Sequence, residues 1–152
     1  MSFVIGPGSP EELETALLLR RADEHSHSLY PPEGVHTLPV EALKGRNVYF
    51  VVARDAGAIL GCGAIVLQED GWAEIKRIFV DAAARRRGVG AAILGALEEF
   101  ARTKRVRRLR LETGPRQPEA IGLYRRFNYF ERGPFGTYRE DPFSVFMEKT
   151  IE

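Results

Sequence analysis

The sequence predicts one α/β domain, residues 1–152, built on a mixed and mostly antiparallel twisted sheet. Three observations predict it. Two apolar, β-branched runs, "VYFVVA" and "AILGCGAIVL", are separated by the turn sequence Asp55-Ala56-Gly57, which is typical of antiparallel strands. The apolar spacing changes from that of a strand to that of a helix at Val89. A strand, a helix and a strand follow one another from Ile75 to Thr113, which predicts a parallel strand pair with a right-handed crossover.

The N-terminal part contains a strand, a helix and a loop. Residues 3–5 are expected to form a short first strand. Ser9-Pro10-Glu11-Glu12 matches a capping box with proline at the first helical position, so a helix is expected to begin there. The apolar residues expected on its buried face are Leu13, Ala16 and Leu17. Residues 25–39, "HSHSLYPPEGVHTLP", show no periodicity and are expected to form a loop that ends in a short helix at residues 40–44.

The remaining segments alternate between strand and helix patterns. Asp70-Gly71 is a turn that leads into a third strand, "WAEIKRIFV". The apolar face expected for the next helix consists of Val89, Ile93, Leu94, Leu97, Phe100 and Ala101. A strand "LRLET", a helix "QPEAIGLYRRF" and two closing strands, "YFERG" and "SVFMEKTI", complete the domain. About four helices are therefore expected to flank the sheet.

The composition is that of an ordinary globular protein, with 44% hydrophobic and 28% charged residues. No apolar run approaches the length of a membrane span, and the N-terminus lacks a basic start followed by an apolar segment. Cys62 is the single cysteine and is expected to be a small buried side chain within a strand. We therefore expect a cytoplasmic protein that does not bind a membrane.

The net charge of +1 hides an uneven distribution along the chain. Residues 1–75 carry 5 basic and 11 acidic side chains, whereas residues 76–132 carry 15 basic and 6 acidic ones. The basic middle indicates an anionic partner bound at one place, and a solvated basic face is the alternative. The nearly neutral total disfavours nucleic acid as this partner.

Three arginines, Arg85 to Arg87, precede the helix that begins near Val89, although a helix N-terminus already carries about half a positive charge. Cations at this end cost about 0.3–1 kcal/mol each, so a bound anion would explain them. Unpaired N–H groups of a first helical turn form such an anion site, and Gly88 and Gly90 let a ligand approach the backbone closely. Neither the G-x-G-x-x-G nor the P-loop spacing is present.

The segment "IKRIFVDAAARRRGVGAAILGALEEFA" resembles the central motif of the GNAT superfamily, the acetyl-CoA-dependent N-acetyltransferases. The motif R/Q-x-x-G-x-G/A, between a strand and a helix, is matched by Arg85, Gly88 and Gly90. The second family element, a strand and then a helix with a tyrosine, is matched by "LRLETGPRQPEAIGLYRRFNYFE". The resemblance implies a GNAT-like sheet whose central parallel strands splay apart. Asn128 stands where the family commonly has glycine, and asparagine also tolerates the left-handed conformation that ends a helix.

The resemblance also implies a binding site for acetyl-CoA. The backbone of Ile78, Phe79 and Val80 would pair with the pantetheine arm. Gln117 stands where an asparagine often contacts the pantetheine. The pyrophosphate would be held by backbone N–H groups, with arginine side chains adding charge, in the residues Arg85, Arg86, Arg87, Gly88, Val89, Gly90 and Ala91.

In this family the amine commonly attacks the thioester directly, without an acyl-enzyme. Tyr124 matches the general acid by position, and a phenol with a pKa of about 10 is protonated at neutral pH. The alternative is that Tyr124 is a core aromatic residue. Glu74, at the start of the central strand, is the candidate base, and the alternative is an exposed residue paired with Lys76 or Arg54. Glu112 could instead bind the ammonium group of the acceptor.

Tyr30, His36, Arg77 and Tyr138 are the further candidates to line the acceptor site. An arginine at position 77 that faced the cleft would favour an acceptor with a carboxylate, such as an amino acid. The H-x-H sequence at residues 25–27 has no nearby cysteine or ordered carboxylate to complete a ligand set, so no metal is expected.

The sequence therefore predicts an acyltransferase that acetylates the primary amine of a small molecule. One alternative is acetylation of a protein N-terminus or lysine, and another is a non-catalytic CoA-binding module. A homodimer through edge strands, which is common in such folds, is a further expectation.

Overall fold

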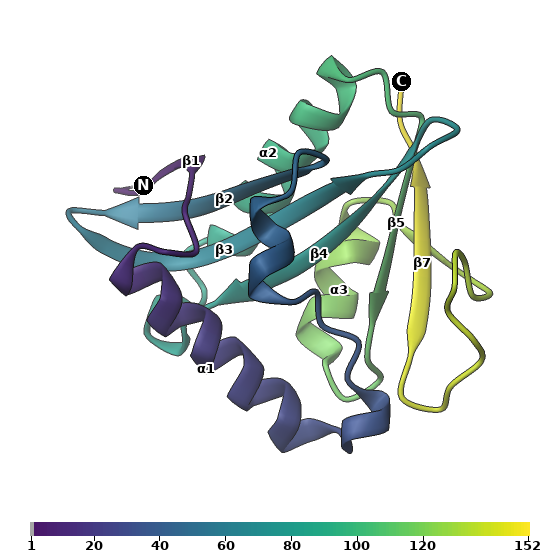
Figure 1. Cartoon of the computed structure of the whole chain (residues 1–152), viewed down its shortest axis with the longest axis horizontal. Helices are drawn as coiled ribbons and strands as arrows, with labels where there is room; N and C mark the ends of the chain where they lie inside the picture. The colour runs from purple at the N-terminus through teal and green to yellow at the C-terminus, as the bar shows by residue number, and fades with distance from the viewer. Residues whose placement is uncertain (1) are drawn as a thin grey trace.

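The computed structural model describes residues 2–152, whose strands form one seven-stranded sheet in the order β1-β2-β3-β4-β5-β7-β6 (Figure 1). The strands are β1 (Val4–Pro7), β2 (Val48–Asp55), β3 (Ala58–Leu67), β4 (Trp72–Val80), β5 (Arg108–Thr113), β6 (Phe130–Arg132) and β7 (Val145–Thr150). Every neighbouring pair is antiparallel except β4 and β5, which are parallel. The predicted mixed sheet with one parallel pair is confirmed.

Helices cover both faces of the sheet. The α-helices are α1 (Leu13–Leu29), α2 (Val89–Thr103) and α3 (Pro118–Arg126). Figure 1 shows α1 in front of the sheet and α2 and α3 behind it. The short 3-10 helices are η1 (Pro32–Gly34), η2 (Val40–Lys44) and η3 (Ala82–Ala84). The fourth helix predicted at residues 40–44 is therefore a 3-10 helix, a form that occurs in such short pieces.

Two apolar cores lie on the two faces. Behind the sheet, the predicted face of α2 is buried, with Ile93 and Leu97 packed in one cluster with Ile75 and Leu109. In front, α1 packs in a second cluster that includes Cys62. Burial raises the pKa of the Cys62 thiol to about 12, so it stays protonated and unreactive, as a small buried side chain should.

The first helix differs from its prediction at both ends. It begins at Leu13 after the N-cap residue Glu12, because the hydroxyl of Ser9 already accepts a hydrogen bond from the Glu11 N–H in a preceding turn. It continues to Leu29, so the first five residues of the predicted loop are helical. The buried residues are Thr15, Leu18, Leu19 and Ala22, and Leu13 is 70% exposed. The predicted buried face of α1 was therefore wrong: the residues that face the core lie one or two positions further along the chain, and one of them is a threonine.

The parallel strands β4 and β5 diverge halfway along β4. They pair from Trp72 with Arg108 to Ile75 with Leu111, and no pairing of β4 with β5 follows within residues 2–152. At the same point β4 has a bulge against β3, in which Arg77 takes a φ of 62°. Such a conformation costs a non-glycine residue about 1–2 kcal/mol and is common at functional sites. The bulge turns β4 away from β5, as Figure 1 shows, and opens the sheet at its centre.

The end of α3 agrees with its prediction. Asn128 has a φ of 72°, and its N–H bonds to the carbonyl of Arg125 at 3.0 Å. Asparagine therefore replaces glycine in the left-handed position that ends this helix.

Candidate active site

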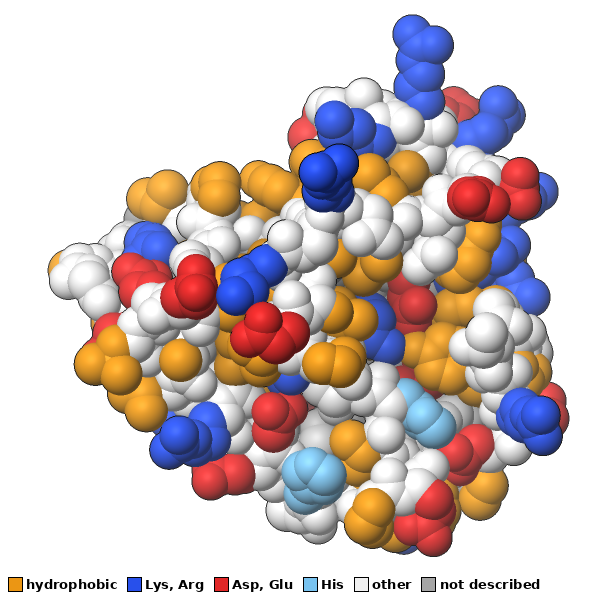
Figure 2. All heavy atoms as spheres, in the orientation of Figure 1, with side chains coloured by type: hydrophobic (Ala, Val, Ile, Leu, Met, Phe, Trp, Pro, Cys, Tyr) orange, Lys and Arg blue, Asp and Glu red, His pale blue; other side chains and the backbone are white. Residues whose placement is uncertain are grey.

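A cavity of about 600 Å³ fills the space between the diverging strands. It is continuous from the N-terminus of α2, past the open edge of β4, to the C-terminal part of α1 and the loop after it. Figure 2 shows a hollow on this face with charged side chains of both signs and a histidine around it. The divergence of β4 and β5 therefore creates a site that reaches from one face of the sheet to the other.

The N-terminus of α2 presents unpaired backbone donors to the cavity. Gly88 is the N-cap residue, with a φ of 79° that favours glycine, and no side chain caps the helix. The first intrahelical bond runs from the Ala92 N–H to the Gly88 carbonyl, so the N–H groups of residues 89–91 have no helical partner. A β-carbon at Gly88 would meet open space, and Gly90 lines the cavity. This geometry is that of an anion site.

The three arginines of this loop divide into two groups. Arg85 and Arg86 are exposed and line the cavity. The guanidinium of Arg87 instead contacts the Asp55 carboxylate at 3.0 Å and the Ser2 hydroxyl at 2.9 Å. This cation holds the pKa of Asp55 below its usual range. The backbone of Arg87 is therefore part of the loop before α2, while its side chain connects this loop to the end of β2.

The other residues predicted to hold the donor also line the cavity. Ile78, Phe79 and Val80 lie on the part of β4 that no longer pairs with β5, where a linear ligand could add as a strand. Gln117 precedes α3, and its amide oxygen accepts a hydrogen bond from the Tyr30 hydroxyl at 3.2 Å. The amide expected to contact pantetheine is therefore engaged with Tyr30, the residue that follows α1.

Tyr124 projects from α3 into the cavity and is buried. No hydrogen bond to its hydroxyl occurs within residues 2–152. Burial, and the nearby charge of Glu112, raise the pKa of the Tyr124 phenol well above its usual value. The hydroxyl is therefore protonated at neutral pH and available as a proton donor.

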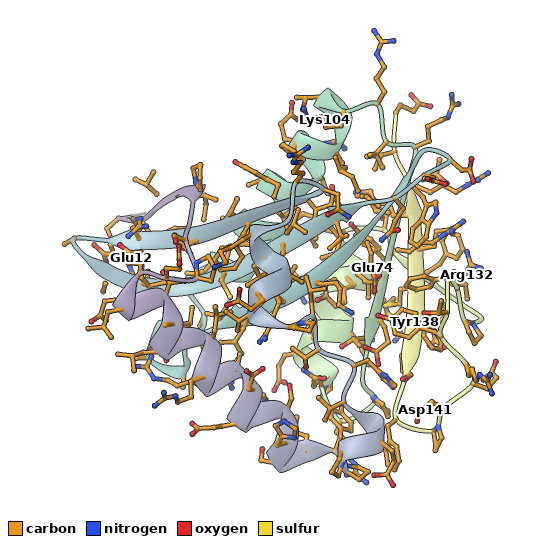
Figure 3. The ribbon with its side chains drawn as sticks, in the orientation of Figure 1. Glu12, Glu74, Lys104, Arg132, Tyr138 and Asp141 are labelled. Carbon is orange, nitrogen blue, oxygen red and sulfur yellow. The ribbon has the colours of Figure 1, made fainter. Side chains whose placement is uncertain are left out.

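Glu74 does not line the cavity, because the loop of residues 133–144, which we call the lid loop, covers it. Its side chain faces the loop of residues 133–144, where its Oε2 accepts a hydrogen bond from the Tyr138 hydroxyl at 2.5 Å (Figure 3). The Lys76 ammonium lies 3.4 Å from the same oxygen. Glu74 is only 8% exposed, so it is not the exposed strand residue that was one alternative, although its pairing with Lys76 is as expected. Its contacts are those of a residue that holds the lid.

Glu112, at the end of β5, lines the cavity and is half-buried, whereas Glu119, the other carboxylate lining it within residues 2–152, is exposed. Burial raises its pKa to about 7, and a hydrogen bond from Ser144 at 2.8 Å, together with the positive groups His36 and Lys76, limits the rise. A carboxylate with this pKa is half ionised at neutral pH, which suits a general base. The sequence indicated Glu112 as an ammonium-binding residue and did not reveal the pKa, because the burial depends on the distant loop that carries Ser144.

Of the remaining acceptor candidates, Tyr30 and His36 line the cavity, and Tyr138 lies behind it on Glu74. His36 contacts the Asp141 carboxylate at 3.0 Å and packs edge-on against the Tyr138 ring. This contact connects the loop after α1 to the lid loop. Both loops therefore cover the acceptor end of the cavity.

Arg77 lines the cavity but its charge is already partnered. Its guanidinium contacts the Asp23 carboxylate of α1 at 2.7 Å and donates to the Leu38 carbonyl at 2.9 Å. The side chain of Arg77 is only 4% exposed. The reason for expecting an acceptor carboxylate was a free Arg77, and the structure removes that reason. Asp23 is 54 residues away in sequence, so no local pattern could reveal the pair.

Two residues of the site had no sequence signal, namely Ser144 and Phe143, which lie at the end of the lid loop. Phe143 lines the cavity and packs edge-on against Tyr30 at 6.3 Å between ring centroids.

In the part of the chain that the structure describes, no group of three or more His, Cys, Asp or Glu side chains is placed to hold a metal ion. None of the described helices is long and apolar enough to cross a membrane.

Known proteins share this fold and sequence pattern. The profile of the Acetyltransferase (GNAT) family matches residues 15–129. The IAA acetyltransferase of Azospirillum brasilense is 40% identical over 151 residues, 99% of each chain. The uncharacterised N-acetyltransferase YsnE of Bacillus subtilis is 34% identical over 146 residues, 93% of this chain and 97% of YsnE. A Klebsiella pneumoniae structure assigned to the acyl-CoA N-acyltransferases is 38% identical, with a TM-score of 0.82 over 97% of both chains.

Proposed function

The chain belongs to the GNAT family of acetyltransferases, whose acyl donor is acetyl-CoA, and we propose that it acetylates the primary amine of a small molecule. The observation that carries this proposal is one continuous cavity that joins the anion site of α2 to the half-buried carboxylate of Glu112. Unpaired N–H groups of residues 89–91, with Arg85 and Arg86, fit the pyrophosphate of the donor. The open edge of β4 fits its pantetheine arm.

Glu112 is proposed to prepare the acceptor. An amine arrives mostly as an ammonium ion, which cannot attack a carbonyl, and the ionised carboxylate of Glu112 removes one proton. With a pKa of about 7, Glu112 is ionised in a large fraction of molecules at neutral pH and is still basic enough to take that proton. The proton passes later to solvent, which restores the carboxylate.

Tyr124 is proposed to protonate the leaving sulfur. Acetyl-CoA supplies a thioester: its carbonyl carbon forms a bond to the amine nitrogen, its C–S bond breaks, and the products are an amide and a thiol. The phenol of Tyr124 gives its proton to the sulfur, and the second amine proton replaces it, so atoms and charge balance. The raised pKa of Tyr124 keeps the proton in place until a thiolate forms.

Two features support a small molecule over a protein chain as acceptor. The loop after α1 and the lid loop of residues 133–144 meet over the acceptor end, where His36 contacts Asp141 and the Lys76 ammonium donates to the His36 carbonyl at 3.0 Å. A covered pocket suits a metabolite, whereas a peptide needs an open groove. The name of the Azospirillum relative, an IAA acetyltransferase, also points to a small acceptor.

The experiment is a thiol-release assay with acetyl-CoA against amines, amino acids and peptides, with calorimetric titration of acetyl-CoA in parallel. We expect thiol release with small amines and none above background with peptides. Acetyl-CoA binding without turnover of any acceptor would instead indicate a CoA-binding module. Turnover of peptides alone would indicate a protein acetyltransferase.

A further inference from the structure

Within residues 2–152, one lysine and one arginine line the acceptor end of the cavity, and acidic groups partner both. Arg77 lies 2.7 Å from Asp23. Lys76 lies 3.4 Å from Glu74 and donates a hydrogen bond to the Tyr138 hydroxyl at 2.6 Å. Both ammonium and guanidinium groups are therefore neutralised where they stand. A negatively charged acceptor would have to compete with a carboxylate that is already in place for either of them.

The acidic side chain at this end is in the opposite situation. Glu112 accepts a hydrogen bond from the neutral hydroxyl of Ser144, and no basic side chain within residues 2–152 lies within 4 Å of its carboxylate. The Glu112 carboxylate therefore lacks an ion-pair partner within residues 2–152, although His36 and Lys76 act on it from a greater distance. An acceptor with a positive charge supplies the missing partner, and one with a negative charge adds repulsion in a poorly solvated site.

Another part of the cavity wall is aromatic. Tyr30 and Phe143 pack edge-on at 6.3 Å, and His25 packs against Phe79 at 6.1 Å, all of them on the cavity surface. The Tyr30 hydroxyl is already engaged with Gln117 and the Arg116 N–H, so the ring is the part of Tyr30 left to contact an acceptor. Such surface binds an apolar or aromatic group of the acceptor. The Arg116 guanidinium lies over both the Tyr30 and Phe143 rings, but Arg116 is not among the residues that line the cavity.

Resting on the proposed acetylation, we propose that the acceptor is a primary ammonium compound with an apolar, ring-sized group and no carboxylate beside its nitrogen. The ammonium binds at Glu112, and the apolar group lies against Tyr30 and Phe143. An α-amino acid is excluded because its carboxylate would lie within a few ångströms of Glu112 while Arg77 remains occupied by Asp23.

The first test compares two acceptors that differ only in charge, L-phenylalaninol and L-phenylalanine, by kcat/KM in the thiol-release assay. We expect phenylalaninol to be better by about tenfold or more, the factor that corresponds to about 1.4 kcal/mol. Equal or better turnover of phenylalanine would overturn the proposal and leave acetyl transfer intact. Turnover of other amines, with neither of these two acetylated, would also overturn it. The absence of turnover with any amine would overturn the proposed function as well.

The second test removes the ion-pair partner of the Arg77 guanidinium. Asp23→Asn removes the partner of Arg77 without removing side-chain volume, and we expect the preference for phenylalaninol over phenylalanine to fall several-fold. Asp55→Asn is the matched control, because Asp55 pairs with Arg87 outside the cavity and its loss should leave the preference unchanged. An unchanged preference in Asp23→Asn would count against the proposal. If Asp23→Asn fails to fold, the comparison of the two acceptors on the natural protein still decides.

Discussion

The hydroxyl oxygen of Tyr30 lies in the space that a β-carbon at Gly114 would need. Tyr30 can therefore contact the loop between β5 and α3 only because residue 114 is glycine. There it accepts a hydrogen bond from the Arg116 N–H at 3.1 Å and donates one to the amide of Gln117. Arg116 also contacts the Leu29 carbonyl at the end of α1. These contacts hold α1 against the loop between β5 and α3, which are two walls of the cavity.

Gly114→Ala should therefore open that contact. The new methyl group overlaps the Tyr30 hydroxyl, and overpacking of this kind costs about 1–3 kcal/mol. Urea denaturation should show this loss, and the KM for the acceptor should rise. Gly95→Ala in α2 is the control, because its β-carbon would meet open space; there alanine should stabilise by about 0.5–1 kcal/mol. Equal stability of Gly114→Ala and the natural protein would show that the contact is absent.

Glu112→Gln should lower kcat/KM by about 10²–10⁴, the usual contribution of a general base. In the natural protein, kcat/KM should rise with pH and level off above about 7, because the ionised carboxylate is the active form. The groups that face Glu112 and influence this value are Ser144, His36, Lys76 and Glu74.

In Glu112→Gln, the rise of kcat/KM with pH below about 7 (the acid limb of the profile) should disappear. Glu74→Gln should keep it, since its partner Tyr138 is behind the cavity wall. An acid limb that survives in Glu112→Gln and disappears in Glu74→Gln would assign the base to Glu74.

Ionisation of Glu112 should lower the free energy of unfolding as pH rises. Its pKa is raised from 4.5 to about 7 in the folded protein, so the folded state binds the proton more tightly than the unfolded state does. The stability from this site is fully present below pH 4.5 and is lost as pH rises through 7. A shift of this size corresponds to about 3 kcal/mol. Glu112→Gln should therefore melt higher than the natural protein at pH 8 and not at pH 4.5, as thermal unfolding would measure; equal melting at both pH values would contradict the raised pKa.

Tyr124→Phe should lower kcat by about 10²–10⁴ because the departing thiolate loses its proton donor. The acetyl-CoA affinity should stay within about twofold, since Tyr124 lines the cavity and its hydroxyl makes no hydrogen bond within residues 2–152 that holds the fold. Kinetics and calorimetry on the same preparation separate the two effects. Full activity of Tyr124→Phe would reduce this residue to a core aromatic.

The arginines before α2 should differ in their effect on donor binding. The double variant Arg85→Ala with Arg86→Ala should weaken acetyl-CoA binding by about tenfold through lost charged hydrogen bonds. Arg87→Ala should leave the affinity nearly unchanged, because its side chain already pairs with Asp55 on the protein. Calorimetry at two salt concentrations would check this. A larger loss for Arg87→Ala would assign the phosphate contact to that side chain.

Much of the fold could be predicted because it depends on local patterns. The strands of residues 48–80, the apolar face of α2 and the left-handed Asn128 follow from periodicity and from backbone preferences. The start and face of α1 could not be predicted, since Ser9 caps a turn three residues before the true N-cap, Glu12, and Thr15 takes a core position. Local rules describe which residues favour a helix, and packing decides where it begins.

The candidate site divides in the same way. The sequence by itself determined the donor side, because the glycines and arginines of residues 85–91 and the tyrosine of α3 act through a continuous loop and helix. Only the tertiary structure decided the acceptor side. Arg77 is neutralised by Asp23, 54 residues away, and Glu112 is raised toward neutral pH by burial beneath the loop that carries Ser144. Charge and acidity depend on what surrounds a group in space, and those surroundings come from segments that are distant along the chain.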